Sequence, residues 1–378
     1  MSRLQDLATY FDARRATLLD DVESLVTRES PSDDADHVTA LATWIADRMT
    51  PARAERVACP GRGDALRLRL GAEQGGTLLL GHLDTVWPLG ALAELPFRVS
   101  ADVATGPGVF DMKAGISVLL SLVDAITAGE VSPKGGLSIL LTPDEEIGSH
   151  ASRELLVAEA KRRDRVMVLE PSGDGGAAKV ARKGIGLVAA RFFGIASHAG
   201  LDPEKGASAL LELSRFVLFA DGLADMPIGT SVVPTVATAG TKTNVVPEKA
   251  ELSVDFRVWT QAEGERVERA LHAYTPRDSR VRVLVEGGMN RPPMEPTPVS
   301  EALYAQAAAL APSLGLVLPA ARVGGASDGN LTAAAGVPTL DGLGPSGGGA
   351  HARSEHLVVS DLPRRAALLA ALLEDVKP

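Results

Sequence analysis

The sequence predicts an α/β protein in which a smaller α+β domain interrupts a larger one. Strand-like and helix-period segments alternate as far as about residue 170, which is typical of a layered sheet with helices packed on it. From about 184 to 290 the chain changes to strand-rich segments interleaved with two helical stretches. A length of 378 residues also fits two domains of roughly 100–200 residues each.

In the first part of the chain, the expected helices are 34–50, 111–126 and 152–163, and the expected strands are 77–86, 137–146 and 165–172. The strands are apolar runs that end in polar residues. Ligands of such sheets bind beyond the carboxyl ends of the strands, so the polar residues at these ends are candidates for a site.

The inserted domain is expected to contain strands within 186–195, 235–246 and 250–258. A proline-rich stretch at 289–298 then favours an extended linker, because proline cannot donate a ladder hydrogen bond. Helical patterns return at 300–314 and 361–376. We therefore expect the domains 1–183, 184–294 and 295–378, with the last part rejoining the first.

The composition limits what the protein binds. Hydrophobic residues make up 45% and charged residues 23% of the chain, the balance of a globular enzyme. The single cysteine, Cys59, excludes a thiolate zinc cage, so a metal would be bound by oxygen and imidazole. A formal charge of −10 argues against a nucleic-acid partner and favours a small substrate.

The sequence shows no sign of a membrane segment, because no apolar run reaches the roughly 18 residues of a membrane helix. The first residues also lack the apolar core of a secretory signal, so we expect a cytoplasmic protein without a membrane partner.

The first candidates for a metal site are His82, Asp84 and Asp111. His82 and Asp84 follow the apolar run of the strand 77–86, and strand alternation would place both on one side. The carboxylate could then orient the imidazole while the imidazole binds a metal; a hydrogen-bonded histidine at a strand end is the alternative. Asp111 lies between a glycine-rich turn and a helix, where an aspartate that only caps the helix is the alternative.

Further acidic residues end the next two strands. Asp144, Glu145 and Glu146 emerge together from an apolar strand, which is costly unless a cation neutralises them; an exposed acidic turn is the alternative. Glu170 ends the following strand. His351 lies on a late glycine-rich loop that lacks the spacing of a phosphate or dinucleotide loop; a surface histidine is the alternative. Two histidines and three carboxylates together suit a site for two metal ions.

The chain resembles the co-catalytic zinc peptidases, which include glutamate carboxypeptidase, acetylornithine deacetylase, succinyl-diaminopimelate desuccinylase and aminoacylase. The resemblance is carried, in order, by GHLDTVWP, GPGVFDMKAG, TPDEEIGS, LEPS and the late histidine loop. It covers nearly the whole chain, and the segment 181–213 is most similar to the glutamate carboxypeptidase branch. It implies a catalytic domain with a central mixed sheet flanked by helices, and an inserted α+β dimerisation or lid domain.

The resemblance implies two Zn²⁺ ions per chain, for which other divalent ions such as Co²⁺ can substitute. In the implied arrangement Asp111 bridges both ions, His82 and Glu170 complete one site, and Glu146 and His351 complete the other. The peptide bond after Asp111 is expected to be cis.

The resemblance also implies the chemistry. Glu145 would be the general base, which takes a proton from a water that bridges the metals and later passes it to the leaving amine. Asp84 would orient His82. The implied reaction, like that of glutamate carboxypeptidase, cleaves an amide bond next to a free carboxylate in a small molecule or short peptide. An N-acyl-amino-acid deacylase is the main alternative, and a non-catalytic binding protein with this fold is the other.

In the inserted domain, three residues match further positions of the family. His198 resembles the histidine that reaches the site of a neighbouring subunit, which implies a homodimer joined through this domain. Asn244 and Arg257 resemble the pair that anchors the substrate, although a turn residue and half of a salt bridge are their alternatives.

Two groups lie outside the matched positions. Lys179, Arg182 and Lys183 form a basic cluster that could face an acidic substrate side chain, with a solvated turn as the alternative. Glu355 and His356 follow the late histidine loop and are possible supporting groups for a metal site.

Overall fold

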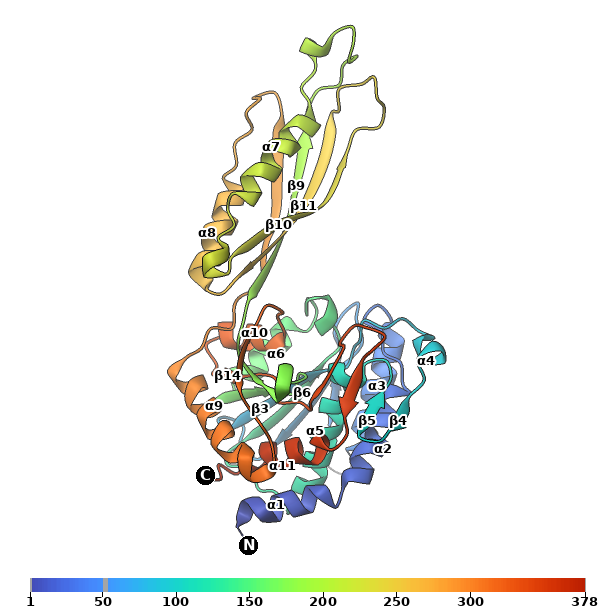
Figure 1. The fold of residues 1–378 in the computed structure, drawn as a ribbon, viewed down its shortest axis with the longest axis vertical. Helices are drawn as coiled ribbons and strands as arrows, with labels where there is room; N and C mark the ends of the chain where they lie inside the picture. The colour runs from blue at the N-terminus through green and yellow to red at the C-terminus, as the bar shows by residue number, and fades with distance from the viewer. Residues whose placement is uncertain (1, 50–53, 378) are drawn as a thin grey trace. The chain divides into compact units, whose positions relative to one another are not determined.

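The computed structural model describes residues 2–49 and 54–377 and contains two compact units (Figure 1). The larger unit comprises Met1–Ala181, Pro296–Val323 and Ser327–Pro378, and the smaller comprises Arg182–Glu295 and Gly324–Ala326. The smaller unit is therefore an insertion into the chain of the larger one.

The larger unit is built on a six-stranded mixed sheet. Its strands lie in the order β1 (Glu55–Val57), β2 (Ala65–Leu70), β6 (Leu137–Thr142), β3 (Thr77–His82), β7 (Arg165–Val168) and β14 (Thr339–Leu340). The strands β6, β3, β7 and β14 run parallel, whereas β2 runs antiparallel to β1 and to β6. Every residue of β3 and β6 is buried, as expected of central strands covered on both faces. The predicted mixed sheet is thus confirmed.

Helices cover both faces of this sheet. The core on one face contains residues of α1 (Arg3–Asp12), α2 (Arg15–Val26), α3 (Ala35–Arg48), α5 (Ala114–Thr127), α9 (Pro298–Leu310) and α11 (Asp361–Leu373). Of these helices, α3, α5 and α9 contact the strands, whereas α1 packs against α11 and α2 against α5. The other face packs against α6 (Arg153–Ala160) and α10 (Asp328–Ala334). Strand alternation sends Leu79 into the first core and its neighbours Leu78 and Leu80 into the second. The short helix α4 (Ala91–Glu94) contributes no buried residue.

Two smaller sheets complete this part of the chain. The strands β15 (Gly347–Gly348), β16 (His356–Val358), β5 (Val103–Thr105) and β4 (Arg98–Ser100) form an antiparallel sheet, and β8 (Ala178–Arg182) pairs with β13 (Ala320–Val323). The basic residues Lys179 and Arg182 are therefore part of a strand, and Arg182 is only 3% exposed. The alternative of a solvated turn is wrong for these two residues.

The smaller unit has the α+β architecture expected of the insertion. Its antiparallel strands lie in the order β10 (Ser231–Ala239), β11 (Lys249–Val258), β9 (Gly184–Phe193) and β12 (Arg282–Arg291). The helices α7 (Ala209–Asp221) and α8 (Gln261–His272) pack on one face of this sheet (Figure 1). Alternate residues of β9 and β11, such as Phe192 and Phe256, form the core beneath them.

Several predicted elements differ in extent from those observed. The strands β6, β7 and β10 end at Thr142, Val168 and Ala239, earlier than predicted. The strand β3 ends at His82, so Asp84 lies on the loop that follows it. The helix α5 begins only at Ala114, and a tight turn precedes it. No helix in the described parts of the chain is long and apolar enough to cross a membrane.

Candidate metal centre

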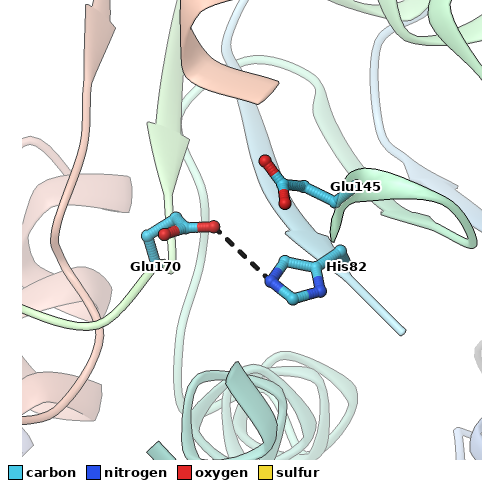
Figure 2. Close-up of side chains that lie close together, drawn as sticks. All are labelled: His82, Glu145 and Glu170. Carbon is cyan, nitrogen blue, oxygen red and sulfur yellow. Dashed lines mark ion pairs between the residues drawn. The ribbon is translucent and has the colours of Figure 1, made fainter. Parts of the chain in front are cut away.

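Four candidate residues lie at the carboxyl ends of neighbouring parallel strands. His82 is the last residue of β3, and Glu170 lies two residues beyond the end of β7. Glu145 and Glu146 belong to a short 3-10 helix, Glu145–Ile147, that follows β6. Because β6, β3 and β7 are parallel neighbours, their carboxyl ends meet at one edge of the sheet. Figure 2 shows the side chains of His82, Glu145 and Glu170 converging there, with Oε1 of Glu170 3.5 Å from Nε2 of His82.

Asp111 reaches the same place from the turn that precedes α5. Its backbone has non-helical angles, φ −110° and ψ 98°, and the peptide bond that follows it is cis, as predicted. The N-cap of α5 is Lys113, without a capping side chain, so the alternative in which Asp111 caps this helix is wrong. The Oδ1 atom of Asp111 lies 3.2 Å from Nε2 of His82, and its Oδ2 atom lies 3.4 Å from Nε2 of His351. One carboxylate therefore faces two histidines.

His351 comes from a turn of the loop between β15 and β16. Its φ of +63° is in the left-handed region, where histidine is found more often than most residues. Its Nε2 atom lies 3.1 Å from Oε2 of Glu146, and its side chain is half exposed. The structure thus brings together all five predicted ligands, which come from five separate parts of the sequence.

The acidic groups perturb the titration of both histidines. Burial favours the neutral form of His82, but its acidic neighbours, Asp111 foremost, outweigh burial and raise the pKa of His82 well above its usual range. Hydrogen bonds with Asp111 and Glu146 raise the pKa of His351 to about 10. Burial raises the pKa of Glu146 even though His351 opposes this. A divalent cation bound here would displace the imidazole protons and neutralise the acids in their place.

The arrangement of donor atoms fits a metal. Two groups, His82 with Glu145 and Glu170, and His82 with Asp111 and Glu146, each offer atoms within 4.8 Å of one another. The Oε1 atom of Glu146 is buried and has no hydrogen-bond partner among the described residues. All donors are carboxylate oxygen or imidazole nitrogen, which suits Zn²⁺ and similar divalent ions.

Asp84 supports two of these groups at once. The Nδ1 atom of His82 lies 2.9 Å from the backbone carbonyl oxygen of Asp84 and 3.4 Å from its Oδ1 atom. The carboxylate of Asp84 also accepts hydrogen bonds from the backbone N–H groups of Glu145 and Glu146, both at 3.1 Å, and from Oγ of Ser32. It therefore holds the turn that carries the two glutamates, a role that the sequence pattern did not suggest.

Comparison with known proteins identifies the family. Residues 78–375 match Peptidase family M20/M25/M40. The chain belongs to this family. Carboxypeptidase G2 of Pseudomonas sp. (strain RS-16) is 32% identical over 369 residues, which cover 94% of this chain and 88% of the relative. A succinyl-diaminopimelate desuccinylase of Methylococcus capsulatus is 30% identical over 327 residues, which cover 82% of this chain and 85% of the relative. The solved aminopeptidase PepT of Bacillus cereus has the same fold, with a TM-score of 0.76 at 22% identity over 96% of this chain and 98% of that one.

Membership of the M20/M25/M40 family confirms the resemblance seen in the motifs. The family consists of metal-dependent hydrolases, and the buried cluster of histidines and carboxylates agrees with that property. The protein is therefore a hydrolytic enzyme of the metallopeptidase and amidohydrolase class, which favours it over the non-catalytic alternative.

In the smaller unit, the structure brings His198 and Asn244 together. Asn244 lies in the loop between β10 and β11, and its carbonyl oxygen accepts a hydrogen bond from the N–H of Ala199 at 2.9 Å. The exposed ring of His198 accepts hydrogen bonds at Nδ1 from the N–H groups of Gly200 and Leu201, at 3.1 and 3.0 Å. A neutral ring that accepts at Nδ1 carries its proton on Nε2, so His198 presents an N–H donor.

Arg257 lies at the other end of the same sheet. The part of β11 from Lys249 to Arg257 spans about 26 Å at roughly 3.3 Å per residue. Arg257 pairs with Asp255 at 3.1 Å and donates to the carbonyl oxygen of Gly324 at 3.2 Å. Asn244 lies in a turn and Arg257 forms a salt bridge, so both alternatives considered for these residues are observed. Within one chain the two residues lie far apart.

The sequence pattern also missed the place of Lys179. Its Nζ atom lies 3.9 Å from Oε2 of Glu170. Burial opposes a low pKa of Asp111, but hydrogen bonds with His351 and His82 outweigh burial, and the charge of Lys179 adds to their effect and lowers that pKa further. The signal was present, since Lys179 belongs to the basic cluster that follows Glu170, but the alternation of strand β8 was not recognised.

Proposed function

We propose that the protein is a two-metal hydrolase that cleaves an amide bond next to a free carboxylate, in the manner of a glutamate carboxypeptidase. The observation that carries this proposal is the carboxylate of Asp111, whose two oxygens face His82 and His351 separately. A carboxylate in this position is suited to bridge two cations that have one histidine each. The name of the relative carboxypeptidase G2 supports the carboxypeptidase reaction.

We assign two Zn²⁺ ions, or divalent substitutes such as Co²⁺, to the five ligands. Asp111 is shared, His82 and Glu170 hold one ion, and Glu146 and His351 hold the other. Contacts of 3.5 Å between His82 and Glu170, and of 3.1 Å between His351 and Glu146, support this division. When bound, such a pair of ions lowers the pKa of a water and polarises the substrate carbonyl.

Glu145 is the proposed general base. Its carboxylate offers an oxygen within 4.8 Å of donor atoms of His82 and Glu170, and Asp84 fixes its backbone. It accepts a proton from the attacking water and passes that proton to the amine nitrogen as the C–N bond breaks. The products are a carboxylic acid and a free amine.

The substrate is held by residues of the smaller unit in this proposal. Arg257 exchanges Asp255 for the free carboxylate of the substrate, which suits the planar guanidinium group. The Nε2–H of His198 donates to the oxygen that becomes negatively charged, and Asn244 anchors the substrate beside it. Since about 26 Å of strand separates the two ends of β11, we assign His198 and Asn244 to the site of a second copy of the chain. A homodimer through the smaller unit follows.

A panel of matched substrates tests the reaction. We expect hydrolysis of amides that end in a free glutamate carboxylate, including folate-type conjugates, and little hydrolysis of the same compounds with that carboxylate blocked as a carboxamide. Activity should disappear after chelation and return with Zn²⁺ or Co²⁺. Equal turnover of free and blocked substrates would contradict the proposed role of the carboxylate.

A deacylase of N-acyl amino acids is the second candidate. It is favoured by the 30% identity to a succinyl-diaminopimelate desuccinylase. Faster turnover of N-succinyl or N-acetyl amino acids than of glutamate conjugates would support it over the first. The cytoplasmic location and the lack of a nucleic-acid partner stay predictions from the composition.

A further inference from the structure

Glu355 is a buried carboxylate with four hydrogen-bond donors around it. The residue is 3% exposed and directly precedes β16. Its Oε1 atom accepts from the N–H groups of Phe110 and Asp111, at 2.9 and 3.0 Å. Its Oε2 atom accepts from the N–H of Gly108 at 2.9 Å and from Nε1 of Trp87 at 2.7 Å. One side chain therefore satisfies three backbone donors of a single turn.

The turn that Glu355 holds is the one that carries Asp111. Gly108 has a φ of +69°, a left-handed conformation that favours glycine, so this segment is not a regular helix that could satisfy its own N–H groups. Buried backbone donors without partners are costly. The position of Asp111 thus depends on an acceptor that lies 244 residues away in the sequence.

Glu355 also belongs to the turn that carries His351. The N–H of Ala352 donates to the carbonyl oxygen of Gly349, and the N–H of Glu355 donates to that of Ala352, both at 2.9 Å. The two turns are joined through this one side chain. By contrast, His82 ends β3 and Glu170 follows β7, so strands of the central sheet place these two ligands.

We propose that Glu355 is a positioning residue that fixes Asp111 and His351 relative to each other, and so sets the affinity of the ion assigned to Asp111, Glu146 and His351. The proposal rests on the two-ion assignment of the proposed function. Loss of a residue that orients a ligand typically weakens metal binding about 10–100-fold. Because strands of the central sheet carry His82 and Glu170, the other ion should be affected less.

The variant Glu355→Gln tests this assignment. Gln has the size of Glu, but its amide nitrogen turns an N–H group toward backbone N–H donors. We expect the Co²⁺-loaded variant to lose one ion per chain at a chelator concentration about 10–100-fold lower than wild type. The remaining absorption spectrum should match that of His351→Ala, and kcat should fall while KM stays near the wild-type value.

Glu159→Gln is the matched control in the same unit. Glu159 is a buried glutamate, 1% exposed, that accepts hydrogen bonds from Arg69 and Ser138 away from the metal site. The variant Glu159→Gln should lower the midpoint of thermal unfolding and leave the release of both ions unchanged. Equal weakening of both ions in Glu355→Gln, or release of both ions as in wild type, would overturn the proposal.

Trp87→Phe is a second variant in case Glu355→Gln does not fold. It removes one of the four donors and should shift the release of the same ion in the same direction, but less. Wild-type release of both ions in Trp87→Phe, with Glu355→Gln unfolded, would overturn the proposal.

The wild-type protein separates this proposal from the proposed function. If it binds two ions but hydrolyses no amide, only the proposed function is contradicted, and the chelator titration still decides the role of Glu355. Wild-type protein that binds fewer than two ions would overturn both.

Discussion

Asp111 precedes α5 at a position where an aspartate often caps a helix, yet its carboxylate faces two histidines. Two features account for this: the helix begins at Ala114, and the three residues before it form a turn that aims the side chain elsewhere. The backbone of that turn is held by Glu355. The side chain of Asp111 is therefore left with both oxygens available for other partners.

Asp111→Ala should lower the metal content of both proposed sites, because the two ions share this ligand. We expect the variant to retain fewer than two zinc ions per chain after dialysis, measured by atomic absorption. Asp102→Ala is a control, since Asp102 is an exposed residue that pairs with Ser360. Unchanged zinc stoichiometry in the Asp111→Ala variant would mean that Asp111 is not the ligand shared by the two ions.

Glu145→Gln should keep both ions and lose most activity. Gln fills a similar volume but cannot accept the proton from water, and removal of a general base typically lowers the rate about 10²–10⁴-fold. Zinc content and kcat should be measured on the same preparation. Near-normal turnover of the Glu145→Gln variant would mean that another residue is the general base.

Asp144 is the nearest alternative base, but its carboxylate is already in use. It is fully buried and accepts hydrogen bonds from the N–H of Ala151 at 2.7 Å and from Oγ of Ser152 at 2.5 Å. Asp144→Asn is therefore expected to reduce stability more than it reduces kcat, which is the opposite of Glu145→Gln.

At the scale of elements, the central strands could be predicted because their signal is local. β3, β6 and β7 are nearly continuous apolar runs, and the polar residues that follow each of them proved to share one edge of the sheet. The strands β15 and β16 are two and three residues long. Runs this short show neither an alternating pattern nor an apolar one, so the sequence did not indicate them.

The supporting contacts of the site could not be predicted for a related reason. Glu355 lies 244 residues from Asp111, and Ser32 lies 52 residues from Asp84. Such contacts depend on how the sheet and its loops are assembled, and the pattern of apolar and polar residues along the sequence does not predict them. The five ligand candidates could be chosen only because a resemblance to known motifs was added to patterns that were weak one by one.

Helix α7 offers a test of stability away from the site. Glu212 of this helix is buried and accepts hydrogen bonds from Oη of Tyr274 at 2.6 Å, from the N–H of Arg277 at 2.9 Å and from Arg215 at 2.8 Å. Burial alone would raise the pKa of Glu212, but these hydrogen bonds outweigh burial and lower it. The charged form is therefore the one that the folded unit prefers.

Glu212→Gln should destabilise the protein in a pH-dependent way. Because the pKa of Glu212 is lower in the folded than in the unfolded state, its contribution is fully present above the unfolded value of about 4.3 and is lost as the pH falls through the folded value. We expect a loss of roughly 1.5–3 kcal/mol in the free energy of unfolding at pH 7, measured with urea. The difference from wild type should shrink below about pH 4. A difference that stayed constant from pH 7 to pH 3 would show that packing, not charge, is responsible.

At the scale of the whole molecule, the smaller unit has exposed features that a second copy of the chain would cover. β10 is an edge strand with exposed apolar residues, among them Val233 at 48% and Val236 at 62%. On α7, Leu218 is 74% exposed. Unpaired edge strands favour association with another chain. Both features belong to the unit through which we propose that the dimer forms.

A complementation experiment tests whether His198 acts across that dimer. His198→Ala should lose roughly 3–4 kcal/mol of transition-state stabilisation if its Nε2–H donates to the developing oxyanion. The His198→Ala chain keeps Glu145, and the Glu145→Gln chain keeps His198, so one site in each mixed dimer contains both intact groups. Equal mixing with subunit exchange should restore about one quarter of wild-type activity, because half of the dimers are mixed and each regains one of two sites. Exchange should be verified with differently tagged chains. If exchange occurs and activity does not return, His198 acts within its own chain or has no part in the reaction.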